Sequence, residues 1–380
     1  MAAKKDPKDI YKKLGVKQAI SASGPTTLYG GSKLRTEVME AMNATATMMV
    51  NMDELNKKAG EVVAEHTGAE AGMVCSGSAG GLILQAAAVI AGNDPAKMYQ
   101  LPDTTGMKNE IIIHNIHRFP YDQCYRAAGA KLVGVGDYLR CLPWQLETAI
   151  NEKTAAIAYL ESPFVAQRAM PLEQVVEIAH KHDVPVILDA ASMLPPRANL
   201  KKYIAQGVDM VVYSGGKALR GPQGTGILAG RADLVEAAYA SASPHQAIGR
   251  GLKVSKEEII GLVHALETFV NEDEAAEMRR YRQLSQMVVD ALIEMPGLDV
   301  SLEHDDKDWL IPSAVIRFTR EWRGPSKDEI LKAMSGGDPP IYMHWLAGPG
   351  ILAVDPLNVS EDEMKVLIRR LREELNKSPR

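Results

Sequence analysis

Short apolar runs alternate with amphipathic stretches through the middle of the chain. The apolar runs cover residues 71–75, 110–114, 131–135, 155–160, 184–188, 210–213 and 226–229. Between them, residues 82–90 and 173–182 carry apolar side chains at helical spacing, and both stretches are predicted helices. Continuous Val, Ile and Leu runs between helices are typical of parallel strands that are buried on both faces. The pattern therefore predicts an α/β fold with a mostly parallel, seven-stranded type of sheet.

The pattern changes near residue 256. From there the spacing of apolar residues predicts three helices and three strands, which together form a smaller α+β domain. The helices are expected at 257–271, 274–293 and 360–376, and the strands at 298–302, 313–318 and 341–343. A polar helix is also expected at 53–65. We therefore expect an N-terminal segment (1–45), a large domain (46–255) and a small C-terminal domain (256–380).

Charge and cysteine content indicate which partners and which cellular location to expect for the chain. It has 380 residues with 43 basic and 48 acidic side chains, a formal net charge of -5, which argues against a nucleic-acid partner. Its 3 Cys residues form no disulfide framework, so a reducing, cytoplasmic location is expected. The charged N-terminus does not have the pattern of a signal peptide. No run of about 18 apolar residues is present, which excludes a membrane helix.

The 31 Gly residues gather in clusters, and this distribution is informative. Clustered glycines permit positive φ angles and a close approach of the backbone to a ligand. The clusters include 77–81, 215–216, 221–226, 336–337 and 348–350. Several of them directly follow predicted strands, which is where a parallel sheet binds its ligands.

Asp189 and Lys217 each lie just beyond a predicted buried strand, about one strand–helix–strand unit apart. This pair indicates pyridoxal 5'-phosphate, which needs a lysine amine to form a Schiff base and a carboxylate to keep its pyridine nitrogen protonated. The cofactor also needs an anion cradle for its phosphate. The segment 76–81 provides hydroxyls, backbone N–H groups and a helix N-terminus, and Ser214 provides another hydroxyl.

At this point the chain resembles the fold-type I pyridoxal phosphate-dependent transferase fold. The resemblance is to the branch that contains selenocysteine synthase (L-seryl-tRNA selenium transferase) and D-glucosaminate-6-phosphate ammonia-lyase. The order and spacing of several segments carry it: residues 21–24, 28–32, 52–55, 76–81, 117–122, 188–191, 214–217, 221–226, 248–254 and 337–341. Together these segments are specific for the fold and the cofactor, and much less specific for the reaction.

The resemblance implies a role for each matching residue. Lys217 forms the Schiff base and moves the proton at the substrate's α-carbon, and Asp189 pairs with the pyridine nitrogen. His117 stacks on the ring, with Phe119 as a competing candidate. The residues implied to hold the phosphate are Ser76, Gly77, Ser78 and Ser214, with Arg250 or Lys253 contributed to the cofactor of a neighbouring subunit. Gln223 and Thr225 support the loop after the lysine, and a homodimer or higher homo-oligomer is expected.

One position departs from the family pattern. Relatives typically carry an arginine soon after the Asp-Pro-Pro-Ile segment, suited to a substrate carboxylate by its two-pronged geometry. Here His344 stands there, and a histidine cannot bind in the same way. The substrate is then held by Arg35, Arg118 or Arg168, or carries a different acid group such as a side-chain phosphate. His344 is either an acid for the leaving group or a structural histidine.

The expected reaction is a lyase reaction on a small amino acid or amino sugar acid. Removal of the α-proton and loss of a β-substituent lead to a keto product and ammonia. A pyridoxal phosphate-dependent aminotransferase or racemase, or a selenium or sulfur transferase, remains an alternative. A non-enzymatic relative is disfavoured because Lys217 and Asp189 are both present.

Other motifs for cofactor or metal binding are not supported. No GxGxxG segment is found, and the position five before Gly216 is a valine, which rules out a phosphate-binding Walker loop. His114 and His117 have HxxH spacing without a third ligand nearby, so no metal site is expected.

Overall fold

The computed structural model describes residues 8–163, 169–344 and 348–378. The chain forms two compact units. The larger unit is Lys33–Glu272, and the smaller one contains the described residues up to Ser32 and from Asp273 onward. The contacts thus divide the chain at 32/33 and 272/273, whereas the sequence suggested 45/46 and 255/256. The reason is that α2 (Thr36–Thr45) packs on α11 (Lys256–Asn271), so both helices belong to the larger unit.

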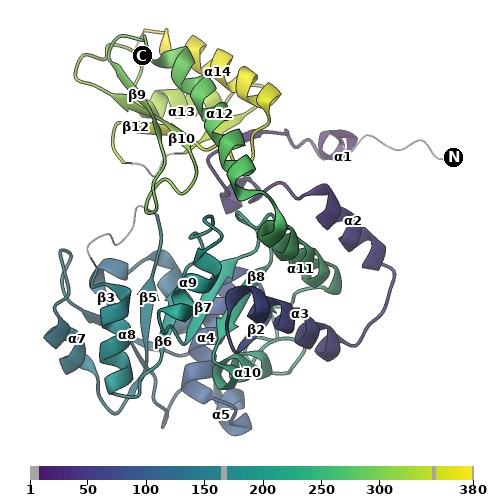
Figure 1. Cartoon of the computed structure of the whole chain (residues 1–380), viewed down its shortest axis with the longest axis vertical. Coiled ribbons are helices and arrows are strands. Elements are labelled where there is room, and N and C mark those ends of the chain that lie inside the picture. The colour runs from purple at the N-terminus through teal and green to yellow at the C-terminus, as the bar shows by residue number, and fades with distance from the viewer. Residues whose placement is uncertain (1–7, 164–168, 345–347, 379–380) are drawn as a thin grey trace. The chain divides into compact units, whose positions relative to one another are not determined.

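The larger unit is built on a seven-stranded sheet (Figure 1). In spatial order its strands are β2 (Ala71–Cys75), β8 (Gly226–Gly230), β7 (Met210–Ser214), β6 (Val186–Asp189), β5 (Thr154–Leu160), β3 (Glu110–His114) and β4 (Lys131–Val135). Only β8 runs antiparallel to its neighbours. The predicted strands and the mostly parallel sheet are therefore confirmed. These strands could be recognised from the sequence because strands such as Val186–Asp189 are buried along their whole length, which requires mostly apolar side chains on both faces.

Two groups of helices cover the two faces of this sheet (Figure 1). The first group consists of α4 (Gly77–Ala91), α5 (Pro95–Gln100), α6 (Gln123–Ala127) and α10 (Ala232–Ala240). The second consists of α3 (Met52–Thr67), α7 (Pro143–Ala149), α8 (Leu172–Lys181) and α9 (Asn199–Ala205). This arrangement follows from the right-handed connections between parallel strands. The connections that contain α4 to α6 lead along the sheet from β2 to β4, and those that contain α7 to α9 lead back from β4 to β7. Connections of the same hand that run in opposite directions lie on opposite faces of the sheet. The carboxyl ends of β2, β3, β5, β6 and β7 consequently share one edge of the sheet.

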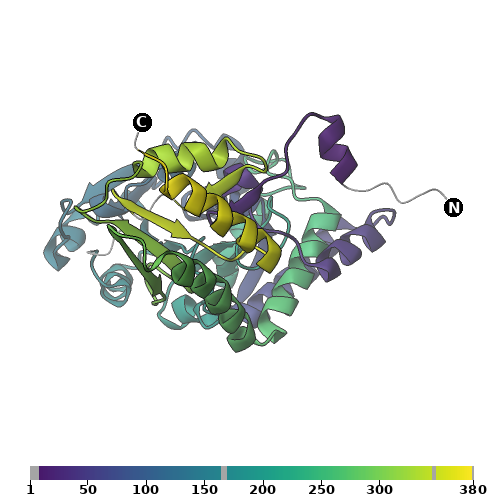
Figure 2. The ribbon, with the colours of Figure 1, turned by 90° about the horizontal axis from the view of Figure 1, so that it is seen from above.

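The smaller unit has its own apolar core. Strands β9 (Leu298–Glu303), β10 (Ser313–Phe318) and β12 (Ile351–Val354) form an antiparallel sheet in the order β12-β10-β9. Helices α12 (Glu274–Leu292) and α14 (Glu361–Leu375) lie side by side against it (Figure 2), and α13 (Lys327–Ser335) packs on α14. A short pair, β1 (Ile20–Ala22) and β11 (Ile341–Met343), joins distant parts of the chain in parallel.

The remaining described helices are short. They are α1 (Lys8–Lys13) and the 3-10 turns η1 (Thr27–Tyr29), η2 (Asn115–His117) and η3 (Pro120–Asp122). Among the helices that the structure describes, none is long and apolar enough to span a membrane.

Candidate active site

The edge formed by the carboxyl ends of the parallel strands gathers most of the predicted cofactor-binding residues of the larger unit. Register aligns Ser214 at the end of β7 with Gly226 of β8, and Gly226 with Cys75 at the end of β2. Asp189 ends the neighbouring strand β6, beside Leu160 of β5. Ligands of open α/β sheets bind beyond such strand ends, so this edge is the candidate active site.

Lys217 and Asp189 form the electrostatic centre of this edge. The Lys217 side chain is partly buried, and its Nζ donates a hydrogen bond to Ser192 Oγ at 2.5 Å. Burial lowers the pKa of the Lys217 amine, and the nearby Asp189 carboxylate opposes that change. Asp189 is buried, which raises the pKa of its carboxyl group, while the Ala191 N–H and Lys217 counteract the rise. The pair therefore consists of an amine and a carboxyl group that are both poorly solvated.

The loop after Lys217 folds back against the two glycines before it. A Cβ on Gly216 would lie 2.5 Å from Gln223 Cα, and one on Gly215 would lie 2.3 Å from Thr225 Oγ1. Thr225 is fully buried, and its hydroxyl donates to the Pro222 carbonyl at 2.6 Å. Only residues without side chains at 215 and 216 allow this packing, which fixes the backbone that carries Lys217.

The segment from Ser76 to Gly81 opens helix α4 at the same edge. Ser76 is the N-cap residue and makes no side-chain capping bond. Gly77 has a φ of +63°, and a Cβ there would have no neighbour within 4 Å, whereas one on Gly226 would lie 2.7 Å from the Gly77 carbonyl carbon. Backbone N–H groups at the start of a helix and free space beside them are the features of an anion cradle. Ser78 lies in the first turn of the same helix.

His117 ends the turn η2 after strand β3 and is 1% exposed. Its Nδ1 accepts a hydrogen bond from the Leu160 N–H at 3.4 Å, and its ring meets those of Tyr159 and His114 edge-on at 4.4 and 5.0 Å between centroids. Burial, with a contribution from His114, lowers the pKa of His117 to about 3. The ring is therefore neutral, and its hydrogen is on Nε2, which has no hydrogen-bond partner among the described residues.

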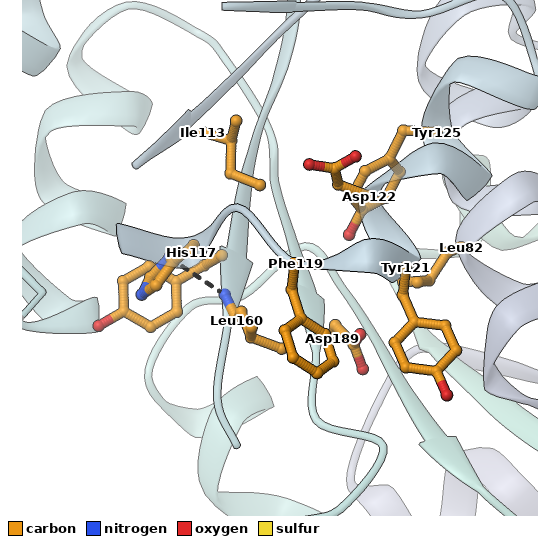
Figure 3. A pocket seen from close by; sticks show the side chains of 10 residues that line it. Leu82, Ile113, His117, Phe119, Tyr121, Asp122, Tyr125, Leu160 and Asp189 are labelled. Carbon is orange, nitrogen blue, oxygen red and sulfur yellow. Dashed lines mark hydrogen bonds between the residues drawn. The ribbon is translucent and has the colours of Figure 1, made fainter. Parts of the chain in front are cut away.

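A small pocket joins His117 to Asp189 (Figure 3). It is lined by Leu82, Ile113, His117, Phe119, Tyr121, Asp122, Tyr125, Tyr159, Leu160 and Asp189. The two predicted candidates for ring stacking, His117 and Phe119, both line this pocket (Figure 3). The aromatic character of this lining suits a flat, partly apolar ligand.

The residues predicted to bind substrate are distributed differently. Arg35 is paired with Glu272 at 2.7 Å, and Arg118 is paired with the pocket residue Asp122 at 2.5 Å. Arg168 lies outside the described residues. His344 belongs to the smaller unit, where burial and the Lys327 charge lower its pKa to about 4.

Arg250 and Lys253 lie in the larger unit, in the turns that precede α11. Arg250 is partly buried and Lys253 is exposed. Among the described residues, no group of three or more His, Cys, Asp or Glu side chains is arranged to hold a metal ion.

Two polar residues at this edge were not recognised from the sequence. One is Ser192, the hydrogen-bond acceptor for Lys217. The other is Glu161, which directly follows β5: its N–H donates to the Asp189 carbonyl at 2.9 Å, and burial raises the pKa of its carboxyl group. Glu161 directly follows strand β5, and Ser192 lies shortly after the end of β6. Both positions therefore lie near a strand end, which is the signal that identified Asp189.

His114, whose ring packs edge-on against that of His117, provides a test of how the stability of the chain responds to pH. Its ring is 1% exposed, both nitrogens lack a hydrogen-bond partner among the described residues, and burial lowers its pKa from 6.5 to about 4. The unfolded chain therefore takes up a proton at higher pH than the folded chain, so stability falls as pH drops below about 6.5.

We expect His114→Phe to remove the part of the pH-dependent loss of stability that comes from His114. Between pH 7 and pH 5, the wild-type chain should lose about 2 kcal/mol more unfolding free energy than the variant. Urea unfolding of both chains at the two pH values measures this difference. Equal losses in the two chains would show that His114 is not held neutral by burial.

Comparisons with known proteins show the family to which the chain belongs. The profile of the SelA family, described as L-seryl-tRNA selenium transferase, matches residues 29–294. A D-glucosaminate-6-phosphate ammonia lyase from Salmonella typhimurium is 34% identical over 96% of this chain and 97% of its own length. A 5'-C-glycyluridine monooxygenase-decarboxylase from a Streptomyces species is also 34% identical, over 96% of this chain and 91% of its own.

A solved structure of D-glucosaminate-6-phosphate ammonia-lyase superposes with a TM-score of 0.83, at 33% identity over 96% of this chain and 98% of that one. The predicted fold class, the pyridoxal phosphate cofactor and the lyase type of enzyme are thereby confirmed. With the family profile covering the whole larger unit and the ammonia-lyase matching over 96% of the chain, this chain belongs to the L-seryl-tRNA selenium transferase family.

Proposed function

We propose that the chain is an ammonia-lyase that acts on a phosphorylated amino sugar acid, with the larger unit as its cofactor-binding domain and the smaller unit as its second domain. The observation that carries the proposal is the end-to-end match to the ammonia-lyase in both sequence and structure. The profile of the selenium transferases, by contrast, ends at residue 294, before the sheet of the smaller unit. The net reaction would convert a 2-amino-3-hydroxy acid into a 2-keto-3-deoxy acid and ammonia, because the water lost in the elimination is regained in hydrolysis.

The residues at the sheet edge fit pyridoxal phosphate. The free space beside Gly77 and the uncapped Ser76 hydroxyl at the start of α4 suit its phosphate, to which Ser78 and Ser214 would add hydroxyls. The Asp189 carboxyl group, whose burial raises its pKa in spite of the nearby Lys217 charge, suits the protonated ring nitrogen. The Lys217 amine lies beside it. We propose His117 as the residue that stacks on the ring, in the pocket that it shares with Asp189.

When bound, the cofactor supplies an electron sink that makes the substrate's α-hydrogen acidic. The chain's own residues then have separate tasks. Lys217 takes the proton from the α-carbon, for which its lowered pKa leaves a larger share of neutral amine near pH 7. Asp189 keeps a proton on the ring nitrogen. His117, neutral because of burial, carries no charge and would offer its Nε2–H to a bound group.

Among the predicted substrate residues, Arg118 has the strongest structural support. Its side chain is 42% exposed and contacts Asp122, which lines the pocket, whereas Arg35 is 15% exposed and held by Glu272. We propose that Arg118 binds an acid group of the substrate, with Arg168 and His344 as further candidates. A bidentate guanidinium contact is well suited to a carboxylate or a phosphate.

We further propose that the protein works in the cytoplasm as a homodimer or a higher homo-oligomer. The free cysteines Cys75, Cys124 and Cys141 support a reducing environment. In the assembly, Arg250 would reach the cofactor phosphate of the neighbouring subunit. A small molecule, not a nucleic acid, is the proposed substrate.

A substrate panel tests the proposed function. Purified protein is incubated with D-glucosaminate 6-phosphate, its unphosphorylated form, simple 2-amino-3-hydroxy acids and 5'-C-glycyluridine. Ammonia, keto acid and carbon dioxide are measured by enzymatic assay and mass spectrometry. We expect equal amounts of ammonia and keto acid from the phosphorylated sugar acid.

Other products would refute the lyase assignment. Carbon dioxide from the glycyluridine, without ammonia from the sugar acid, would place the chain with its Streptomyces relative. An amino acid of inverted chirality, or transfer of the amino group to a keto acid, would identify a racemase or an aminotransferase.

A further inference from the structure

A tight turn follows strand β6 and is organised by Asp189. The Asp189 Oδ1 accepts a hydrogen bond from the Ala191 N–H at 3.0 Å, and the Met193 N–H donates to the Ala190 carbonyl at 3.0 Å. An aspartate that binds the backbone two residues later is a common way to start a turn. The carboxylate that is proposed to hold the cofactor ring therefore also fixes the position of Ser192.

This turn brings Ser192 to the end of the Lys217 side chain. Lys217 Nζ donates to Ser192 Oγ at 2.5 Å, across 25 residues of sequence. Both side chains are partly buried, so the contact is shielded from water. A lysine side chain has four rotatable bonds and loses much rotamer freedom when it is fixed, so a specific acceptor is needed to hold its amine in one place.

We propose that Ser192 is a positioning residue that holds the Lys217 amine beside Asp189 whenever the amine is not joined to the cofactor. Its value for catalysis rests on the proposed function, in which the substrate displaces the lysine and the released amine must then take the α-proton. A hydroxyl suits this task because its oxygen can accept a hydrogen bond from the amine in both the charged and the neutral state.

The hydrogen bond also affects the charge of the amine. Burial lowers the pKa of Lys217, and an acceptor that binds the ammonium form opposes this effect. Removal of the acceptor should therefore lower the pKa of Lys217 further. A hydrogen bond to a charged group of this kind corresponds to a shift of about one pH unit, or a tenfold change in the neutral fraction at a given pH below the pKa.

The first experiment measures the amine itself in the full-length chain freed of its cofactor. Cyanate reacts with neutral amines, so the rate of Lys217 carbamylation is followed by peptide mass spectrometry from pH 6 to pH 10. We expect the half-maximal rate of Ser192→Ala to lie about one pH unit below that of the wild type. Ser192→Thr, which keeps a hydroxyl, should follow the wild type.

Ser241→Ala is the matched control. Ser241 is a fully buried serine of the same unit, and its hydroxyl has no hydrogen-bond partner among the described residues. This variant should leave the Lys217 profile unchanged. Equal profiles for Ser192→Ala and the wild type would overturn the proposal, as would a profile of Ser192→Thr that matches Ser192→Ala.

The second experiment uses the cofactor-loaded enzyme. We expect Ser192→Ala to lower kcat about tenfold with KM and cofactor absorbance unchanged, and Ser192→Thr to restore most of the rate. A rise in KM with unchanged kcat would overturn the positioning role. The two proposals fail separately: altered carbamylation in a chain that binds no cofactor would refute only the proposed function, whereas normal cofactor binding with unaltered carbamylation would refute only the role of Ser192.

Discussion

Replacing Lys217 by alanine is expected to abolish the covalent attachment of pyridoxal phosphate and to lower kcat at least about 10,000-fold. Lys217 is the lysine beside the buried Asp189 carboxyl group at the sheet edge, and burial lowers the pKa of its amine. Its loss removes both the attachment point and the base for the α-proton. The measurement is the ammonia assay on D-glucosaminate 6-phosphate, together with the absorbance of the purified chain between 400 and 430 nm, about where lysine-bound pyridoxal phosphate absorbs.

Lys201→Ala serves as the control for this prediction. Lys201 is an exposed lysine on α9 of the same unit, so its loss should change neither the absorbance nor the rate. A Lys217→Ala variant that keeps the visible absorbance and a rate within tenfold of the wild type would show that another lysine carries the cofactor.

The second large effect is expected for Asp189→Asn, which should lower kcat about 1,000-fold while the cofactor still binds to Lys217. The change keeps the size of the side chain but removes the negative charge that holds a proton on the ring nitrogen. Fixed groups that stabilise charge in a buried site contribute on this scale. Steady-state rates and the visible spectrum of the variant measure the two parts of this prediction.

The same substitution should stabilise the cofactor-free chain at neutral pH. Burial raises the pKa of Asp189, so the folded chain binds this proton more tightly than the unfolded chain does. Its contribution to stability is therefore fully present below the unfolded pKa near 3.8 and is lost as pH rises through the folded pKa. Asparagine is uncharged at every pH and should abolish this loss.

Urea unfolding of the cofactor-free wild type and Asp189→Asn at pH 4 and pH 7 tests whether the substitution abolishes this loss of stability. Asp233→Asn, an exposed position at the start of α10, is the control and should unfold like the wild type. If Asp189→Asn lowers both the rate and the stability at pH 7, the buried carboxylate would have a structural role and not the proposed catalytic one.

The sequence was sufficient to predict the central sheet, for a physical reason. A parallel strand covered on both faces must be apolar throughout, so segments such as Ile111–Ile113 and Val186–Leu188 are visible without any partner. The strands β1 and β12 of the smaller unit were missed. β1 has only three residues and pairs with β11 more than 300 residues later, so neither its length nor its surroundings distinguish it from a loop.

The candidate site was partly predictable in the same way. Asp189 ends a buried strand and Lys217 lies shortly after another, and strand ends of a parallel sheet meet at one edge. Ser192 was missed because its contact with Lys217 arises from a turn that the Asp189 side chain creates, and its place after a strand does not by itself show which residue a serine contacts. The ion pairs of Arg35 and Arg118 were not visible either, because Glu272 lies far from Arg35 in sequence and the Arg118–Asp122 pair depends on two consecutive 3-10 turns.

The claim on which this account depends is that Lys217 carries pyridoxal phosphate. Borohydride reduction of the purified chain fixes any such cofactor to its lysine, and peptide mass spectrometry then locates it. We predict a phosphopyridoxyl group on Lys217 at close to one per chain in the wild type, and on no lysine in Lys217→Ala. A modified lysine elsewhere in the wild type, or no modification after incubation with the cofactor, would contradict the account.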